Sequence, residues 1–140
     1  MQITEHFALH EFALPADKAA RRGCEPAEYP AAFIDTRLRP LCKALERLRA
    51  ELGGAKVTVI SAYRPLPYNR AIGSEDTSQH VQGRAADIQV EGHSAEHVHA
   101  TALRLYEVGE LEIGGLGIYD TFCHLDVRGG PLARWDKRSK

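Results

Sequence analysis

The strongest structural signal in the sequence is a run of leucines between residues 31 and 52. The leucines recur at spacings of three and four residues, and charged side chains fill most of the positions between them. Residues with that spacing share one face of an α-helix, so the segment predicts an amphipathic helix packed on a core. Pro40 lacks an N–H group and clashes with the preceding turn, so it should break or restart this helix. Gly53 and Gly54 should end it.

The rest of the chain alternates short apolar runs with a second helical pattern. The β-branched residues of 57–60 and the apolar run at 85–90 predict two strands. Ser94 is a suitable N-cap for a helix over 95–108. The segment 114–130 is typical of two further strands joined by a turn. These elements predict an α+β fold in which helices pack on one side of a small, largely antiparallel sheet.

Length and charge limit the classes of protein to consider. A chain of 140 residues is most simply one domain over 1–140, with an irregular segment 1–30 packed on it. The formal net charge is −1, which provides no general attraction to nucleic acid or to anionic lipid. No apolar run approaches the roughly 20 residues of a membrane-spanning helix, so membrane insertion is not expected. We expect a monomer.

The cysteines and the N-terminus bear on the compartment. Cys24, Cys42 and Cys123 are odd in number and irregular in spacing, so we expect free thiols in a reducing compartment. The opening residues MQITEHFALHEF lack a basic segment followed by an apolar one, which a secretory signal would need. The chain is therefore expected to be cytoplasmic as synthesised. Action in the periplasm or cell wall would require another release route, or a place in a phage particle.

Three side chains are candidate metal ligands: His80, Asp87 and His124. A catalytic zinc site commonly uses three ligands of these types and leaves a fourth position open. The spacing of His80 and Asp87 alone is weak evidence, because a buried polar pair would look the same, and both interpretations stay open on the residues themselves. His93 and His97 lie near the start of the second helix and are interpreted as surface residues.

The segment around these candidates resembles a known family. Five residues fit the pattern S-x-H-x-x-G-x-A-x-D, namely Ser78, His80, Gly83, Ala85 and Asp87. That pattern marks the zinc D-alanyl-D-alanine carboxypeptidases, in a group that also contains lysostaphin and the signalling domain of sonic hedgehog. The segments HFALHEFA, SAYRP and GGLGIYDTFCHLDVRGG, with the later Arg-Trp pair, are similar to a bacterial and phage branch of these peptidases.

The resemblance implies a site and a role for each of its residues. His80, Asp87 and His124 would hold one Zn²⁺ ion. Arg64 would bind the carboxylate or the developing oxyanion of the substrate, a task that suits its permanently charged, forked guanidinium. Ser78 would form a hydrogen bond that supports the ligands.

The general base is where the sequence departs from the family. Many members carry an acidic residue three positions before the third ligand and some carry a histidine two before it, but Thr121 and Phe122 stand there. We predict Asp126 as the base, because it lies two residues after His124 on the same strand and should share its face. A salt bridge of Asp126 to Arg128 or Arg64 is the other interpretation of this residue. Asp120 is the alternative base, but it precedes His124 by four residues and lies in the predicted turn.

Two functions follow from the resemblance. The first is a zinc metallopeptidase that hydrolyses peptide bonds in the stem peptides of bacterial peptidoglycan, as a D-Ala-D-Ala carboxypeptidase or an endopeptidase. The branch that it resembles suggests a phage or prophage origin, such as an endolysin. The second is a binding or structural module that keeps the metal for stability and has lost catalysis, which the missing acidic residue at position 121 suggests.

Overall fold

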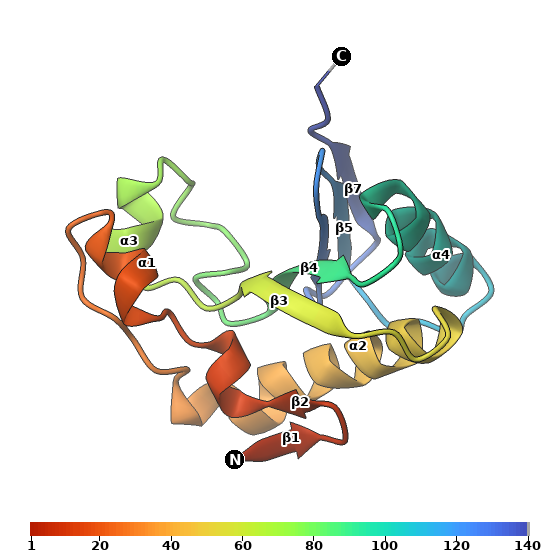
Figure 1. The fold of residues 1–140 in the computed structure, drawn as a ribbon, viewed down its shortest axis with the longest axis horizontal. Coiled ribbons are helices and arrows are strands. Elements are labelled where there is room, and N and C mark those ends of the chain that lie inside the picture. The colour runs from red at the N-terminus through yellow and green to blue at the C-terminus, as the bar shows by residue number, and fades with distance from the viewer. Residues whose placement is uncertain (140) are drawn as a thin grey trace.

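The computed structural model describes residues 1–139, and a five-stranded sheet lies at the centre of the fold (Figure 1). The strand order is β3-β4-β6-β5-β7, and every neighbouring pair is antiparallel except β5 and β7. The expected α+β fold is confirmed. The strands are β3 (Val57–Ser61), β4 (Ala85–Val90), β5 (Gly115–Ile118), β6 (Cys123–Asp126) and β7 (Ala133–Asp136).

The predicted leucine helix forms, and Pro40 begins it. A 3₁₀ turn and a π-helical turn precede α2, which carries Pro40 in its first turn, where a missing N–H group costs no hydrogen bond. Ser94 caps α4 as predicted, because its hydroxyl accepts a hydrogen bond from the backbone N–H of His97 at 3.1 Å. The elements are η2 (Ala31–Phe33), η3 (Ile34–Leu38), α2 (Arg39–Glu51) and α4 (Ala95–Glu107).

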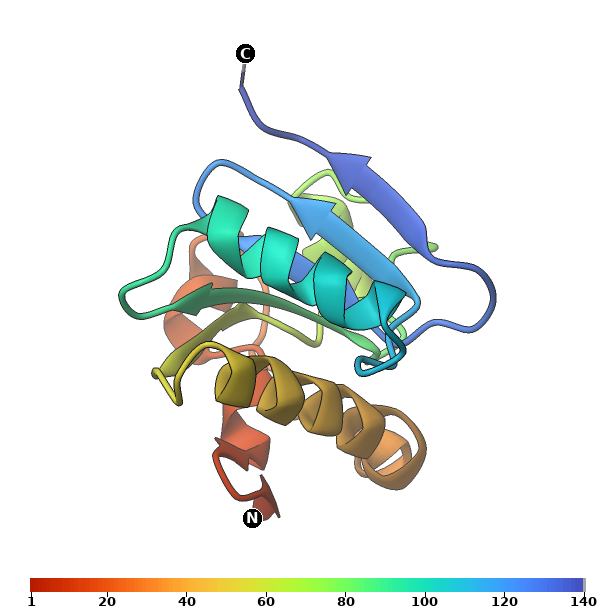
Figure 2. The same cartoon turned by 90° about the vertical axis from the view of Figure 1, so that its right-hand side faces the viewer.

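The two long helices cover one face of the sheet (Figure 2). Leu41, Leu45 and Leu48 of α2 are fully buried, and they belong to the same apolar cluster as Ile88 of β4 and Leu125 of β6. Burying side chains of this size contributes roughly 1.5–3 kcal/mol each. The opposite face of the central strands is thereby left free to carry polar side chains.

The N-terminal segment contains more regular structure than the sequence indicates. Two short strands form a hairpin that places Phe7 in the main core, where its ring meets that of Phe12 edge to face at 6.2 Å. Farther along, α1 and α3 enclose a small second cluster and form a lobe beside the sheet (Figure 1). These elements are β1 (Gln2–Thr4), β2 (Phe7–Ala8), η1 (Leu9–Phe12), α1 (Ala16–Ala20) and α3 (Leu66–Ala71).

The structure also bears on the expected free cysteines and on the expected absence of a membrane-spanning helix. Cys24, Cys42 and Cys123 are all free, as predicted, and burial raises the pKa of both Cys42 and Cys123 to about 12. Cys123 lies in the core, on the side of β6 away from His124. Among the described residues, no helix combines the length and the apolar character needed to span a bilayer.

Candidate metal centre

The site is built on a row of residues that face one another across the sheet. Asp87 of β4 pairs with Ser61 of β3 on one side and with His124 of β6 on the other. His124 in turn pairs with Gly117 of β5, and Gly117 pairs with Trp135 of β7. Directly opposed residues project from the same face, so this register brings Asp87 and His124 together on the face that the long helices leave free.

His80 reaches the same face from the loop before β4. The hydroxyl of Ser78 accepts a hydrogen bond from the backbone N–H of His80 at 3.2 Å, which fits the supporting role expected for Ser78. The backbone N–H of Arg64 donates to the carbonyl of His80 at 3.2 Å, and Nδ1 of His80 donates to the carbonyl of Ala62 at 2.7 Å. The loop is therefore tied to the end of β3 on both sides of His80.

The three predicted ligands come together as a buried cluster. One ligand atom from each of His80, Asp87 and His124 lies within 4.8 Å of the others. Oδ1 of Asp87 is 3.3 Å from Nε2 of His80 and 2.9 Å from Nδ1 of His124. Ligand atoms around a tetrahedral zinc ion, each about 2 Å from the metal, lie about 3.3 Å from one another. The donor set and its spacing fit a zinc ion.

The outer hydrogen bonds of the two imidazoles strengthen this fit. A carbonyl oxygen can only accept, so the bond to Ala62 places the proton of neutral His80 on Nδ1 and leaves Nε2 bare. Nε2 of His124 faces a carboxylate oxygen of Asp126 at 2.8 Å, and Nδ1 faces Oδ1 of Asp87 at 2.9 Å, so each nitrogen of this ring has a carboxylate acceptor. With its proton on Nε2, His124 would offer Nδ1 to a cation beside Nε2 of His80.

The local charges favour the protonation state that a metal requires at Asp87 and His80, but not at His124. Burial opposes ionisation of Asp87, but hydrogen bonds from His124 and His80 outweigh it and hold the pKa of the carboxyl well below its usual range. Burial lowers the pKa of His80, so that imidazole is neutral. Burial acts in the same direction on His124, but the bonds to Asp126 and Asp87 prevail and raise its pKa. The direction of the pKa change at His124 is opposite to the one that metal binding needs, because a ligand nitrogen must be unprotonated.

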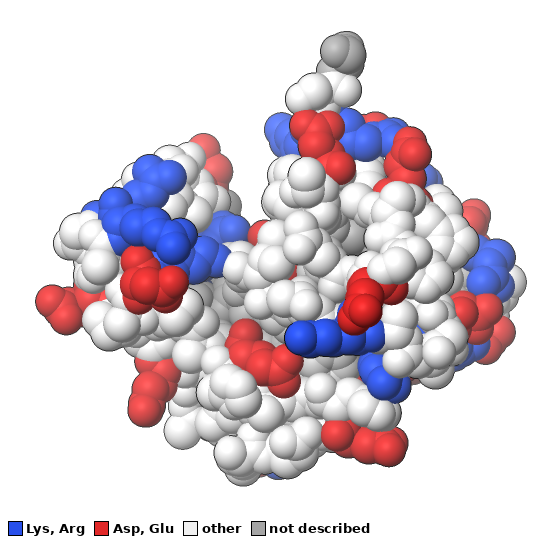
Figure 3. Space-filling view, in the orientation of Figure 1, with Lys and Arg blue, Asp and Glu red and all other residues white. Residues whose placement is uncertain are grey.

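Arg64 lies beside the cluster, as its predicted role requires. Nη2 of Arg64 is 3.3 Å from Oδ2 of Asp87, the oxygen that does not face the imidazoles, and Nε donates to the hydroxyl of Ser61 at 3.1 Å. A hollow of about 350 Å³ opens over these groups, between the lobe of α1 and α3 and the strands β5 and β7 (Figure 3). Arg64, His80, Asp87 and His124 all line it.

Aromatic side chains form one wall of this hollow. The indole N–H of Trp135 donates to the hydroxyl of Tyr119 at 3.0 Å, and the Tyr119 ring stacks on Phe122 with centroids 4.3 Å apart. The centroid of Trp135 lies 4.8 Å from that of His124. Gly117 makes this possible, because a Cβ atom there would lie 2.3 Å from Nε1 of Trp135. The wall gives a substrate an apolar surface next to the ligand cluster.

Comparison with protein families supports the metal centre that the geometry indicates. A family model described as Peptidase M15 matches residues 5–126. The chain belongs to the Peptidase M15 family. Members are zinc D-Ala-D-Ala carboxypeptidases and related metallopeptidases, so the recognised pattern and the buried ligand set point to the same chemistry. A search of curated proteins gives no match. The matched range contains all three candidate ligands and ends at Asp126, before β7.

The two carboxylates considered as the base of this M15 protein lie in different surroundings. Asp126 is completely buried, and its oxygens accept hydrogen bonds from His124 and Arg128. Asp120 is exposed and accepts two hydrogen bonds from Ser139, and it does not line the hollow. Asp126 as base remains a prediction. Glu75, exposed on the loop after α3, also lines the hollow.

Several contacts of the site were not foreseen from sequence. The bond from His80 to Ala62 uses a backbone carbonyl, and the packing of Trp135 on His124 joins strands that are not neighbours in the sheet, so no spacing rule would have found either. The ion pair of Asp126 with Arg128, two residues apart, is a contact that the sequence did indicate. His93 and His97 stack on each other with centroids 5.2 Å apart, outside the ligand cluster. His97 is exposed, as expected, whereas His93 is half-buried, with Nε2 3.1 Å from the carbonyl oxygen of Leu52.

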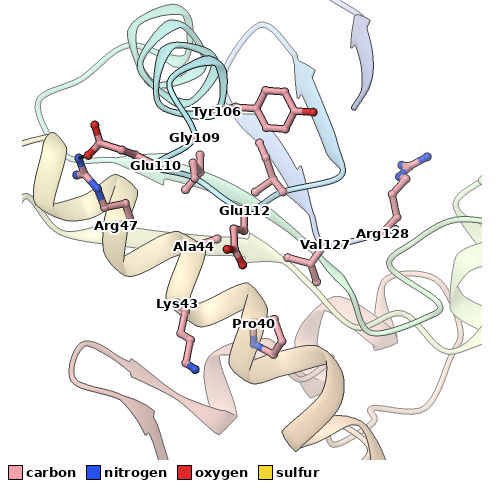
Figure 4. Close-up of a pocket in the computed structure, with 12 residues that line it drawn as sticks. Pro40, Lys43, Ala44, Arg47, Tyr106, Gly109, Glu110, Glu112, Val127 and Arg128 are labelled. Atoms are coloured by element: carbon pink, nitrogen blue, oxygen red, sulfur yellow. Dashed lines mark hydrogen bonds and ion pairs between the residues drawn. The ribbon is translucent and has the colours of Figure 1, made fainter. Parts of the chain in front are cut away.

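A second hollow of about 870 Å³ lies between α2 and the segment after α4 (Figure 4). Charged and apolar side chains alternate around it, and Arg47 closes part of its edge through an ion pair with Glu110 at 2.6 Å. No cluster of potential metal ligands was found there among the described residues. The catalytic interpretation therefore concerns the smaller hollow.

Proposed function

We propose that this M15 member is a zinc peptidase that hydrolyses peptide bonds in the stem peptides of bacterial peptidoglycan, as a D-Ala-D-Ala carboxypeptidase or endopeptidase. The observation that carries the proposal is the buried cluster of His80, Asp87 and His124, in which a nitrogen of each imidazole lies within 3.3 Å of one carboxylate oxygen. Membership of a metallopeptidase family supports the reaction class. A phage or prophage origin, with action in the cell wall, belongs to the same proposal.

Each polar group of the hollow has a role in this function. His80, Asp87 and His124 would hold the zinc ion, which when bound polarises a carbonyl group and lowers the pKa of water. Arg64 would bind the substrate carboxylate or the developing oxyanion, because its guanidinium lies at the rim of the cluster and keeps donors free for a ligand. The aromatic wall would hold the apolar side of the peptide.

Two substitutions, each of a carboxylate by its amide, would identify the residue that accepts the proton. The prediction from sequence is Asp126, and among the residues that line the hollow Glu75 offers a carboxylate outside the ligand set. Exchange of the true base should lower kcat by about 10²–10⁴-fold while zinc stays bound. Asp126→Asn and Glu75→Gln, each measured for zinc content and kcat, therefore distinguish the two.

The experiment that tests the proposed function combines metal analysis with hydrolysis. The purified protein should contain one zinc ion per chain and release fragments from a panel of peptidoglycans and synthetic stem peptides. Mass spectrometry of the fragments would identify the bond that is cleaved. A protein that binds zinc and cleaves none of them would favour the alternative, a zinc-stabilised binding module. One that neither binds zinc nor cleaves would contradict both.

A substitution of Arg64 tests its role in binding. We expect Arg64→Lys to lower kcat/KM by about 100-fold, because lysine keeps the charge but loses the forked donors that span the substrate and Asp87. The measurement is steady-state hydrolysis of a stem peptide, with Arg70→Lys as the control, because Arg70 forms an exposed ion pair with Asp76 outside the cluster. Equal kcat/KM for Arg64→Lys and the wild type would exclude the assigned role.

A further inference from the structure

Both carboxylate oxygens of Asp126 already have hydrogen-bond partners in the protein, which a general base that accepts a proton from water would have to give up. Its Oδ2 atom faces Nε2 of His124 at 2.8 Å and Nη2 of Arg128 at 2.7 Å. Its Oδ1 atom accepts from Nε of Arg128 at 2.9 Å and from the backbone N–H of Arg128 at 3.2 Å. A buried carboxylate needs such partners to stay charged. Both oxygens are therefore committed to a fixed geometry.

The contact with His124 lies on the side of the ring away from the ligand cluster. Nδ1 of His124 faces Asp87, and Nε2 faces Asp126, so the imidazole is held between two carboxylates. A proton held on Nε2 by the outer carboxylate would leave Nδ1 for a metal, and the same contact helps to set the plane of the ring. Without it, the proton could occupy Nδ1 and the nitrogen needed by a metal would be blocked.

Gly115 makes room for this carboxylate. Gly115 is the β5 residue directly opposite Asp126, and a Cβ atom there would lie 2.1 Å from Oδ2 of Asp126. That separation is far below any van der Waals contact, so a side chain at 115 would push the carboxylate out of its place. The glycine at this position is thus explained by the contact that Asp126 makes with His124.

We propose that Asp126, clamped by Arg128 and seated over Gly115, is a positioning residue that fixes the tautomer and orientation of the metal ligand His124. The inference rests on the proposed metal centre and deepens it. It assigns a role in metal affinity to Arg128, which lies beyond the range of the family match, and to Gly115. Removal of an outer partner of this kind typically weakens metal binding by about 10–100-fold.

The test measures zinc affinity by competition with a chromophoric chelator, independently of hydrolysis. We expect Asp126→Ala to bind zinc about 10–100-fold more weakly than the wild type, with a smaller loss in Arg128→Gln. The matched control is Asp136→Ala, because Asp136 and Arg138 form an exposed ion pair with the same spacing and the same atom pattern. The control should bind zinc with wild-type affinity.

Nitrogen-15 NMR of the zinc-loaded protein adds a measurement that a merely structural role would not move. The wild type and Asp136→Ala should show a protonated Nε2 on His124, and the Arg128→Gln variant should show that signal broadened or shifted. If Asp126→Ala fails to fold, Arg128→Gln and Gly115→Ala carry the test, since the first removes the partner of the Asp126 carboxylate and the second displaces the carboxylate, and neither deletes it.

Three outcomes separate the alternatives. Weaker zinc binding in the Asp126, Arg128 and Gly115 variants, with the control unchanged, supports the positioning role. Wild-type zinc affinity in all three, with turnover lost only in Asp126→Ala, overturns it and assigns Asp126 as the base. A wild-type protein that binds no zinc overturns the proposed metal centre itself and the positioning role with it, and this result is distinguishable because no variant is needed to see it.

Discussion

Replacing His80 by alanine is expected to abolish zinc binding and to lower turnover by at least about 1,000-fold. A catalytic metal contributes several kcal/mol to transition-state stabilisation, and each 1.4 kcal/mol corresponds to a factor of about ten in rate. His80 lies in the buried cluster and provides one of its three ligand atoms. Metal analysis and hydrolysis of a stem peptide measure the two effects together.

The same variant should also lose the stabilisation that zinc gives to the fold. A ligand present at about 1,000 times its Kd stabilises the native state by about 4 kcal/mol, so zinc should raise the melting temperature of the wild type and leave that of His80→Ala unchanged. The control is His97→Ala, an exposed residue of α4 outside the ligand cluster. Turnover in His80→Ala equal to that of the control would contradict the assignment of the metal centre.

Truncating Leu45 to alanine is expected to cost about 2–5 kcal/mol of unfolding free energy. Leu45 is fully buried in α2, in the same apolar cluster as the inner faces of β4 and β6, and its loss would leave a cavity under the strands that carry Asp87 and His124. The free energy of unfolding is measured by urea denaturation of the zinc-free protein, so that metal binding does not contribute.

Leu66→Ala is the matched control for this substitution. Leu66 is 37% exposed at the start of α3, so removing its side chain should change the free energy of unfolding by no more than about 0.5 kcal/mol. A loss in Leu45→Ala as small as that of Leu66→Ala would mean that α2 contributes little to the core beneath the site.

Local patterns predicted most of the fold because they depend on neighbours in the chain. The leucine spacing identified α2, Ser94 marked the start of α4, and short apolar runs located β3 and β4. The strand β7 was not predicted because it has only four residues, ARWD, of which none is fully buried and two are charged. This strand forms through parallel pairing with β5, and the local sequence does not indicate that pairing.

In the candidate site, too, some residues were predicted from local sequence and other contacts were not. The ligands were found because a short pattern contains His80 and Asp87, and the alternation along β6 placed His124 on the same face as Asp126. The contact of His124 with Asp126 lies within one strand, so the same alternation brought the two side chains together, although it did not predict the hydrogen bond between them. The bond from His80 to the carbonyl of Ala62 could not be predicted, because it depends on how the loop before β4 meets the end of β3.

The direct pairing of Asp87 with His124 also bears on how the sheet assembles. Because side chains alternate along a strand, a shift of one residue between β4 and β6 would turn one of these two ligands to the opposite face. Only the native alignment therefore presents a complete binding site. A zinc ion that binds during refolding would stabilise correctly aligned chains and leave misaligned ones unaffected, so the proposed metal would also select the native strand register.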